Sequence, residues 1–327
     1  TSLLLNVSKM IWNRDVPVVS FDAPSDTVRF RQDPDLFFLN NPGPLLLDEV
    51  QHVPEIFSWL KRQIDKQPGQ CLYGISGSQS FSLMKGVSES LAGRAMVFDL
   101  WPFCVQEARD VPARAEADTT LDLFENPDQL AKLAGREYSC NDRDDVAELM
   151  LRGGYPPVLL ELAGGIWLES YRRTYIQRDV RSLYPLHDLG AFDRMVMLAA
   201  GRTGQILNKA DVSAALGVDN KTVDNWLRIL EAGYQFFVLQ SYHVNTDKRL
   251  VKRPKLYCAD IGMALHLQGI RDTVALLASP QFGALFETFV VMELRKLYGH
   301  AGRMWDGFFW RQPGGVECDL VLPRAGY

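Results

Sequence analysis

The chain has 327 residues, 47% of them hydrophobic, and carries a formal net charge of −5 at neutral pH. This length suffices for two or three domains, each with its own hydrophobic core. The negative charge excludes a general attraction for nucleic acid, so any such contact requires a local basic patch. No apolar run approaches the length of a membrane span, and we therefore expect no membrane partner.

The cysteines and histidines suggest neither a disulfide framework nor a zinc site. The cysteines are odd in number and scattered, and no CxxC pair occurs among Cys71, Cys104, Cys140, Cys258 and Cys318. This pattern predicts a reducing compartment and therefore a cytoplasmic protein. The five histidines are too dispersed to suggest metal ligands or a nucleophile–base pair.

The first twelve residues predict an apolar helix, and its start is similar to the helix that follows a phosphate-binding P-loop. Thr1 would take the position of the hydroxyl that contacts Mg²⁺, and Ser2 would also lie at the nucleotide. The glycines and the lysine of the loop are absent, so we expect a core that lacks its phosphate cradle. An ordinary helix that begins with a Thr-Ser cap is the alternative.

A strand is predicted at Val16–Phe21, and a second one at Leu45–Leu47, where three leucines between turn-forming residues indicate burial on both faces. Asp48 and Glu49 end this second strand, although an unpaired carboxylate is strongly disfavoured in apolar surroundings. A cation at the strand end removes this penalty. In this Walker-B interpretation Asp48 holds Mg²⁺ through a water and Glu49 polarises the water that attacks the γ-phosphate of ATP. The alternative is a strand that runs into an acidic turn.

Further strands and helices alternate with these two, which predicts a doubly wound parallel sheet; the expected elements are a helix at Glu55–Ile64, a strand at Cys71–Ser76, a helix at Phe81–Leu91 and a strand at Ala95–Leu100. Ligands bind beyond the carboxyl ends of such strands, where Asp48, Glu49 and Ser78 fall. Ser78 either contacts the γ-phosphate or the attacking water, or is a turn serine. Arg94 either reaches a phosphate, in cis or across a subunit boundary in an oligomer, or forms a surface ion pair.

Residues 201–270 predict a winged helix, with helices at Asn208–Leu216 and Asn220–Ala232 and wing strands at Gln235–Leu239 and Leu256–Cys258. Its candidate nucleic-acid contacts are basic: Lys221 and Arg228 on the second helix, and Lys248, Arg249, Lys252, Arg253 and Lys255 between the strands. Asp219 and Asp224 would repel phosphates, and such domains also serve as lids or as protein-docking modules. A DNA partner and a protein partner both remain open.

The tail, Phe282–Leu322, predicts a helix followed by strands. Glu287 on the helix and Asp319 in a hairpin resemble the metal-binding carboxylates of a restriction-endonuclease-like core. That chemistry also needs a third acid and a lysine on a next strand, which the chain does not contain. We therefore expect an incomplete Mg²⁺ site that does not cut nucleic acid.

Several motifs together carry a family resemblance; they are Asp48–Gln51 with Pro54, Ser76–Gln79, Ser90–Arg94 with Pro102, Gly153–Pro156, Tyr175 with Arg178–Val180, Arg202–Gln205, Lys255–Tyr257, Asp260–Gly262 and Gly283–Glu287. In this order they resemble a group of bacterial and archaeal AAA-type ATPases that carry a C-terminal domain of unknown function. The resemblance covers nearly the whole chain and implies ATP and Mg²⁺ as cofactors. It departs at both ends, where the glycine-rich loop and the last strands are absent.

The resulting fold prediction is an α/β protein of four parts: an AAA-type ATPase core at 1–104 that lacks its first strand and P-loop, a helical linker or lid at 105–200, a winged helix at 201–270, and a truncated endonuclease-like region at 271–327. Two hypotheses for function follow. The first is an ATP-binding and ATP-hydrolysing molecular switch coupled to the winged helix and the tail. The second is a nucleic-acid-binding or nuclease-type module with a vestigial nucleotide site.

Overall fold

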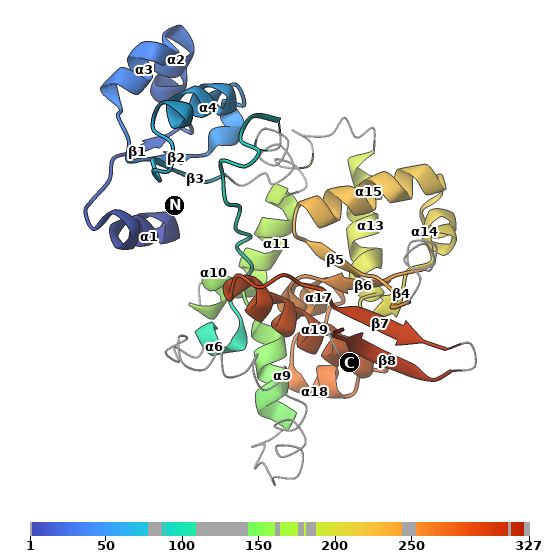
Figure 1. The fold of residues 1–327 in the computed structure, drawn as a ribbon. Coiled ribbons are helices and arrows are strands. Elements are labelled where there is room, and N and C mark those ends of the chain that lie inside the picture. The colour runs from blue at the N-terminus through green and yellow to red at the C-terminus, as the bar shows by residue number, and fades with distance from the viewer. Residues whose placement is uncertain are drawn as a thin grey trace. The chain divides into compact units, whose positions relative to one another are not determined.

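The computed structural model describes residues 2–77, 87, 89–108, 143–160, 164–175, 180, 188–243, 253–312 and 315–323. The chain divides into two compact units, Thr1–Val97 and Phe98–Tyr327 (Figure 1). Each unit is considered by itself. Among the described residues, no helix combines the length and the apolar character needed to cross a membrane.

The first unit contains a three-stranded parallel sheet. Its strands β1 (Val18–Ser20), β2 (Leu45–Asp48) and β3 (Tyr73–Ile75) lie in the order β1-β2-β3. The three leucines of β2 are buried because this strand is central and both of its faces are covered. The predicted parallel sheet of an α/β core is therefore confirmed for these strands.

Helices surround this sheet: α1 (Ser2–Trp12), α2 (Pro24–Gln32), α3 (Pro34–Asn40), the 3₁₀ turn η1 (Val50–His52) and α4 (Ile56–Lys66). Each of α2 and α3 begins with a proline, whose fixed φ suits a first helical position. Phe30 and Phe37 from these helices meet edge to face, with ring centroids 5.3 Å apart, and Phe38 packs on Phe37 in the same way. These rings join Leu45 and Leu47 of β2 in one hydrophobic core.

Helix α1 runs antiparallel to the strands. The indole Nε1 of Trp12, its last residue, donates a hydrogen bond of 2.8 Å to the carbonyl of Cys71, just before β3 begins. Leu4, near the start of the helix, approaches Gly74 in the middle of β3, where a Cβ would lie 3.5 Å from the Leu4 side chain. The first turn of α1 is therefore directed toward the carboxyl end of the sheet, and a small residue in β3 permits the close packing.

The predicted strand at residues 95–100 is wrong. These residues pair with no strand in the described part of the chain, and Met96, Phe98 and Leu100 are exposed. The segment is apolar and β-prone, but an extended segment becomes a strand only where an open sheet edge lies beside it.

The second unit contains an antiparallel sheet with the order β4-β6-β5 and a hairpin; the strands are β4 (Gln205–Ile206), β5 (Phe236–Leu239), β6 (Lys255–Cys258), β7 (Phe308–Arg311) and β8 (Glu317–Val321). Strand β7 is joined to the continuation of β5. Phe309 donates its N–H to the carbonyl of Gln240 and accepts a bond from the N–H of Tyr242. The hairpin is thus anchored to the sheet through main-chain hydrogen bonds.

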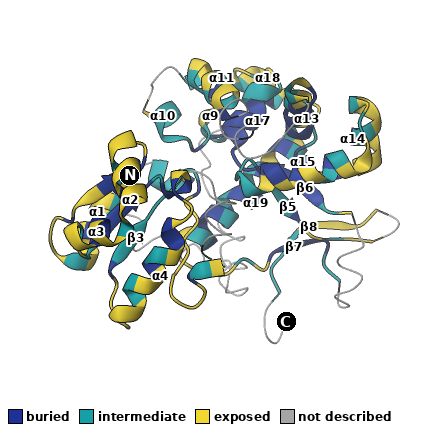
Figure 2. Ribbon diagram, turned by 90° about the horizontal axis from the view of Figure 1, so that it is seen from above, coloured by how far each residue is buried: buried dark blue, intermediate teal, exposed yellow. Residues whose placement is uncertain are grey.

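Helices cover both faces of this sheet; they are α6 (Val105–Ala108), α9 (Arg143–Arg152), α10 (Pro156–Leu159), α11 (Gly164–Thr174), α13 (Leu189–Gly201), α14 (Lys209–Leu216), α15 (Asn220–Ala232), α17 (Ile261–Leu267), α18 (Thr273–Leu277) and α19 (Phe282–His300). Figure 2 shows that α17 and β6 are largely buried. Leu256 and Cys258 pack into the core that includes residues of α13, α15 and α17. Lys255 and Tyr257 point to the opposite face, where both contact Glu287 of α19. This alternation follows the two-residue period of a strand.

Two of the sequence motifs meet in this unit. The N–H of Gly154 donates a 2.7 Å hydrogen bond to Oδ2 of Asp260, whose Oδ1 accepts the N–H of Met263 at the start of α17. Gly153 has φ +66°, and a Cβ there would lie 2.5 Å from the Asp260 carboxylate. The glycine pair and Asp260 therefore form one structural connection between α9 and α17.

Candidate functional site

The carboxyl edge of the parallel sheet holds the first candidate site. Asp48, the last residue of β2, is 5% exposed, and its Oδ1 accepts a hydrogen bond from the hydroxyl of Ser76, which follows β3. Phe21, which follows β1, donates its N–H to the Asp48 carbonyl. The ends of all three strands thus fix the position of this carboxylate. Ser78, the predicted neighbour of Asp48, lies outside the described residues, and Ser76 is the serine that the structure places there.

Glu49 is held in an unusual backbone conformation beside Asp48. Its φ and ψ are 54° and 40°, in the left-handed region that a residue with a Cβ seldom adopts. Its Oε2 accepts a hydrogen bond from the side-chain amide of Gln51, and the following N–H, of Val50, bonds to the Ser76 carbonyl. Such strain persists only where the surroundings enforce it, and it is frequent at functional sites. The local fold therefore turns the Glu49 side chain away from the strand direction and fixes it.

Two residues that sequence reasoning missed lie next to Glu49. Asp22 follows β1, and its Oδ1 is 3.2 Å from Nε2 of His52 at the end of η1. Asp22, Glu49 and His52 offer ligand atoms that all lie within 4.8 Å of one another. An acid follows β1, as acids stand at the end of β2, and this shared position could have identified Asp22 from the sequence. His52 lies beside two acids and not beside another histidine, so the expectation that the histidines are dispersed stays untested as to metal binding.

The start of α1 is expected at the same edge. Thr1 lies outside the described residues, and the side chain of Ser2 is not described. Trp12 contacts the chain just before β3, and Leu4 lies beside Gly74 within β3, so the helix extends along β3 from its amino end. Backbone N–H groups at a helix start are suited to anion binding. The roles of Thr1 and Ser2 stay predictions.

Arg94 is not brought to this edge. Its Nε and Nη2 bond to Oδ1 and Oδ2 of Asp65 at 2.6 and 3.3 Å, and this bidentate partner lowers the pKa of the Asp65 carboxyl. Asp65 lies nine residues beyond the start of α4, about 14 Å along the helix axis. A role for Arg94 at a phosphate stays a prediction, and it requires that this exposed ion pair open.

The basic residues predicted for nucleic acid do not form one surface in the described part of the chain. Arg228 and Arg253 line a cavity of about 590 Å³ together with Lys209, but Asp224 and Glu231 line it too. Lys221 is an exposed residue of α15 outside this lining. Lys248, Arg249 and Lys252 lie outside the described residues. The three bases and two acids of the cavity give little attraction for a polyanion, so nucleic-acid binding stays a prediction.

Lys255 requires a correction, because its side chain is only 3% exposed and cannot serve as a surface contact for phosphate. Its Nζ lies 2.7 Å from Glu287, 2.5 Å from Glu317 and 2.9 Å from Asp319. Burial alone would lower the pKa of Lys255, but hydrogen bonds to the three carboxylates raise it above its usual range. Glu287 and Asp319 do lie together, as predicted for an endonuclease-like site, around a lysine ammonium.

Cys104, Glu107 and His300 also come together, with ligand atoms within 4.8 Å of one another. Glu107 accepts the N–H of Cys104 at 2.9 Å, which is one of the two bonds of a capping box, and the Cys104 carbonyl accepts the N–H of Ala108 in the first turn of α6. Burial raises the pKa of the Cys104 thiol to about 11, so this thiol is protonated at neutral pH. The cluster is accounted for as a helix cap with an ion pair from His300 to Glu107.

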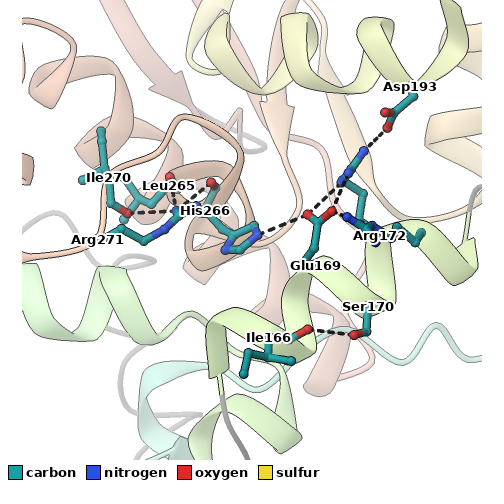
Figure 3. Close-up of polar contacts among 10 residues, drawn as sticks. Ile166, Glu169, Ser170, Arg172, Asp193, Leu265, His266, Ile270 and Arg271 are labelled. Carbon is teal, nitrogen blue, oxygen red and sulfur yellow. Dashed lines mark hydrogen bonds and ion pairs between the residues drawn. The ribbon is translucent and has the colours of Figure 1, made fainter. Parts of the chain in front are cut away.

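A polar network joins three helices in the second unit (Figure 3). Glu169 of α11 accepts hydrogen bonds from Arg172 at 2.7 Å and from Arg173 at 2.8 Å. Arg172 also bonds to Asp193 of α13, and His266 of α17 lies 3.6 Å from Glu169. The network borders a cavity of about 680 Å³. Arg172, whose side chain is only 15% exposed, links α11 to α13.

We expect the Glu169→Gln variant to be less stable than the wild type near neutral pH but not in strong acid. Arg172 lowers the pKa of Glu169 from 4.5 to about 2, opposed by burial and helped by Arg173. The ionised carboxylate therefore stabilises the fold fully above pH 4.5, and this contribution is lost as the pH falls toward 2. Thermal melts between pH 2 and 7 measure the difference in Tm.

The control for this series is Glu148→Gln, which removes only an exposed ion pair to Arg152 and is expected to change Tm little. A Tm difference between wild type and Glu169→Gln that stays constant from pH 7 to pH 2 would contradict the assignment.

Three family models match successive parts of the chain. Residues 1–109 match an AAA domain, residues 143–274 match a domain of unknown function (DUF8612), and residues 282–327 match a second domain of unknown function (DUF4143). The AAA match indicates a nucleotide-binding, ATPase-type region at the start of the chain. The resemblance to ATPases with a C-terminal domain of unknown function is thereby confirmed for residues 1–109 and 282–327.

The chain is also similar to two mycobacterial proteins, uncharacterized protein Mb2031c of Mycobacterium bovis and uncharacterized protein Rv2008c of Mycobacterium tuberculosis. Each is 28% identical over 318 residues, which cover 96% of this chain and 64% of the relative. The chain thus spans less than two thirds of the length of these relatives. No solved structure gives a significant match.

Proposed function

We propose that the first unit is the Mg²⁺ and water-activating side of an ATP-hydrolysing site, and that ATP switches the state of the protein that carries this chain. The observation that carries the proposal is the position of Asp48 and Glu49 at the end of a fully buried central strand. The AAA-domain match over residues 1–109 supports it. Carboxylate oxygens are the ligands that Mg²⁺ takes in such sites.

The residues present fit an ATP-bound Mg²⁺ ion. Asp48 places a carboxylate, only 5% exposed, at the carboxyl edge of the parallel sheet, where ligands bind in such folds. Asp48 would hold the ion through a water, and the Ser76 hydroxyl would keep the carboxylate oriented. When bound, the ion supplies charge neutralisation at the β- and γ-phosphates.

Glu49 would act as the general base. In its left-handed conformation the side chain projects from the carboxyl edge, where the Gln51 amide holds one of its oxygens. The other oxygen would accept a proton from the water that attacks the γ-phosphate. Asp22 and His52, which lie beside Glu49, would border the same water.

The second unit would be the effector of the switch. Helices α14 and α15, followed by the antiparallel strands β5 and β6, have the element order of a winged helix, which supports that finer assignment. The assignment of Glu287 and Asp319 to an endonuclease-like core also belongs to this proposal. Its partner, DNA or protein, is left to experiment.

Nucleotide-dependent thermal stabilisation of the full-length protein tests the proposal. We expect ATP with Mg²⁺, at a hundred times its dissociation constant, to stabilise the wild type by about 2.7 kcal/mol and to raise Tm by several degrees. Asp48→Asn should remove most of this increase, because it removes the charge that holds the ion.

Asp65→Asn serves as the control, since it neutralises an acid of the same unit that pairs with Arg94 instead. This variant should keep the full nucleotide-dependent increase in Tm. An equal increase in wild type and Asp48→Asn, or none in the wild type, would refute the proposal.

A further inference from the structure

A second cluster of acids, remote in sequence from the nucleotide site, surrounds a single lysine. Lys255 is 3% exposed, whereas its partners Glu287, Glu317 and Asp319 have side chains exposed by 15%, 27% and 58%. The three carboxylates come from α19 and from β8, and the lysine comes from β6. The cluster thus joins three elements of the second unit and opens to solvent on the Asp319 side.

The lysine is held in place by its own strand and not only by the acids. Lys255 lies on the central strand of its sheet, paired with Ile206 on one side and with Leu239 on the other. Its Nζ also lies 5.6 Å from the centre of the Phe309 ring. Main-chain pairing on both sides fixes the position of the Lys255 backbone, from which the side chain extends toward the carboxylates.

Without Lys255, the negative charges of the three carboxylates would have little positive charge beside them. Three carboxylates face Lys255, and Arg311 supplies a second, more distant positive charge 3.6 Å from Glu317. The hydroxyl of Tyr257 donates a 2.6 Å hydrogen bond to Glu287. The three carboxylate oxygens lie 2.5–2.9 Å from Nζ, which is hydrogen-bonding distance for an ammonium, and carboxylates are also the ligands of hard metal ions, which they hold at shorter distances.

We propose that Lys255 is the resident cation of this cluster: its ammonium occupies the place that a divalent metal ion would otherwise take, and it clamps the β8 hairpin and α19 to the sheet. While Lys255 is in place, Glu287, Glu317 and Asp319 are closed to metal. A divalent ion enters only when the ammonium is withdrawn. This inference does not depend on the nucleotide site.

The decisive variant is Lys255→Met in the full-length protein, which keeps an unbranched side chain one atom shorter than lysine and removes its charge. Without metal, we expect Tm to fall by about 10 °C, because three carboxylates, of which Glu287 is the most buried, lose the counter-charge that they share. Mn²⁺, added without nucleotide, should restore most of this loss and should lose its free-ion paramagnetic resonance signal as it binds. Adding Asp319→Asn to this variant should abolish the binding.

Lys296→Met is the matched control, since Lys296 is a second buried lysine that bonds to Glu293 and to the carbonyl of Phe103. This variant should lose stability, but Mn²⁺ should not restore it. If Lys255→Met is recovered only when Mn²⁺ is present during purification, that dependence supports the proposal equally.

If Lys255→Met does not fold, the proposal can be tested by comparing the wild type with Asp319→Asn, both of which keep the lysine. Wild type and Asp319→Asn should bind Mn²⁺ to the same extent, because the cluster is already occupied. Binding in the wild type that Asp319→Asn removes would overturn the proposal. So would a folded Lys255→Met variant that Mn²⁺ neither binds nor stabilises.

Discussion

In the full-length protein, Glu49→Gln is expected to lower kcat for ATP hydrolysis by about 10²–10⁴-fold, the range that a positioned general base contributes. An amide of the same shape cannot accept the proton of the attacking water. Nucleotide-dependent stabilisation should persist, because Asp48 and the residues around it are unchanged. Steady-state phosphate release, together with thermal melts in the presence of nucleotide, measures both effects.

Gln51→Ala separates positioning from proton transfer. Gln51 donates a hydrogen bond to the side chain of Glu49. We expect a smaller loss of kcat, about tenfold, because Glu49 keeps its carboxylate but loses a bond that orients it. Hydrolysis by Glu49→Gln at the wild-type rate would show that this glutamate is not the base.

Asp260→Ala is expected to lower the free energy of unfolding of the second unit by about 3 kcal/mol, the sum of a lost helix cap and of a buried N–H left without its acceptor. Asp260 is 1% exposed, caps α17 through the N–H of Met263 at 2.8 Å, and accepts the N–H of Gly154 at 2.7 Å. Urea denaturation measures the loss.

Asp272→Ala provides the matched control for this effect. Asp272 caps α18 with the same geometry, accepting the N–H of Ala275 at 2.8 Å, but it lies at an exposed position. We expect a loss of about 1 kcal/mol, as for an ordinary cap. Equal losses in the two variants would mean that the bond from Gly154 to Asp260 adds nothing.

The part of the fold that could be predicted from sequence depends on local patterns. Three leucines followed by Asp48 and Glu49 indicated a buried strand that ends at a functional edge, and the structure places a fully buried β2 there. Asn220–Ala232 is predicted with the bounds that α15 has, because Asp219 caps its start and Val223, Trp226 and Leu227 recur at helical spacing. Such signals lie within one element and need no knowledge of its partners.

The remainder depends on contacts between distant residues. Lys255 is the last of a run of basic residues, which predicted an exposed surface, yet its acidic partners follow 32 to 64 positions later in the chain. His52 meets Asp22 only because β1 and β2 are neighbours. Residues 95–100 have the composition of a strand and still lack a described neighbour to pair with. In each case a tertiary partner overrides the local pattern.

The two-sided strand β6 has a consequence for how the second unit tolerates change. If the register of β6 shifted by one residue, the Lys255 ammonium would enter the hydrophobic core formed with α13 and α15. Leu256 would then face the carboxylates. Both faces of β6 would be destabilised by that shift, so the pairing register of this strand is strongly specified. Insertions or deletions before β6 must therefore be accommodated by the connecting loop. In chimeric proteins, the junctions should lie outside β6 and not within it.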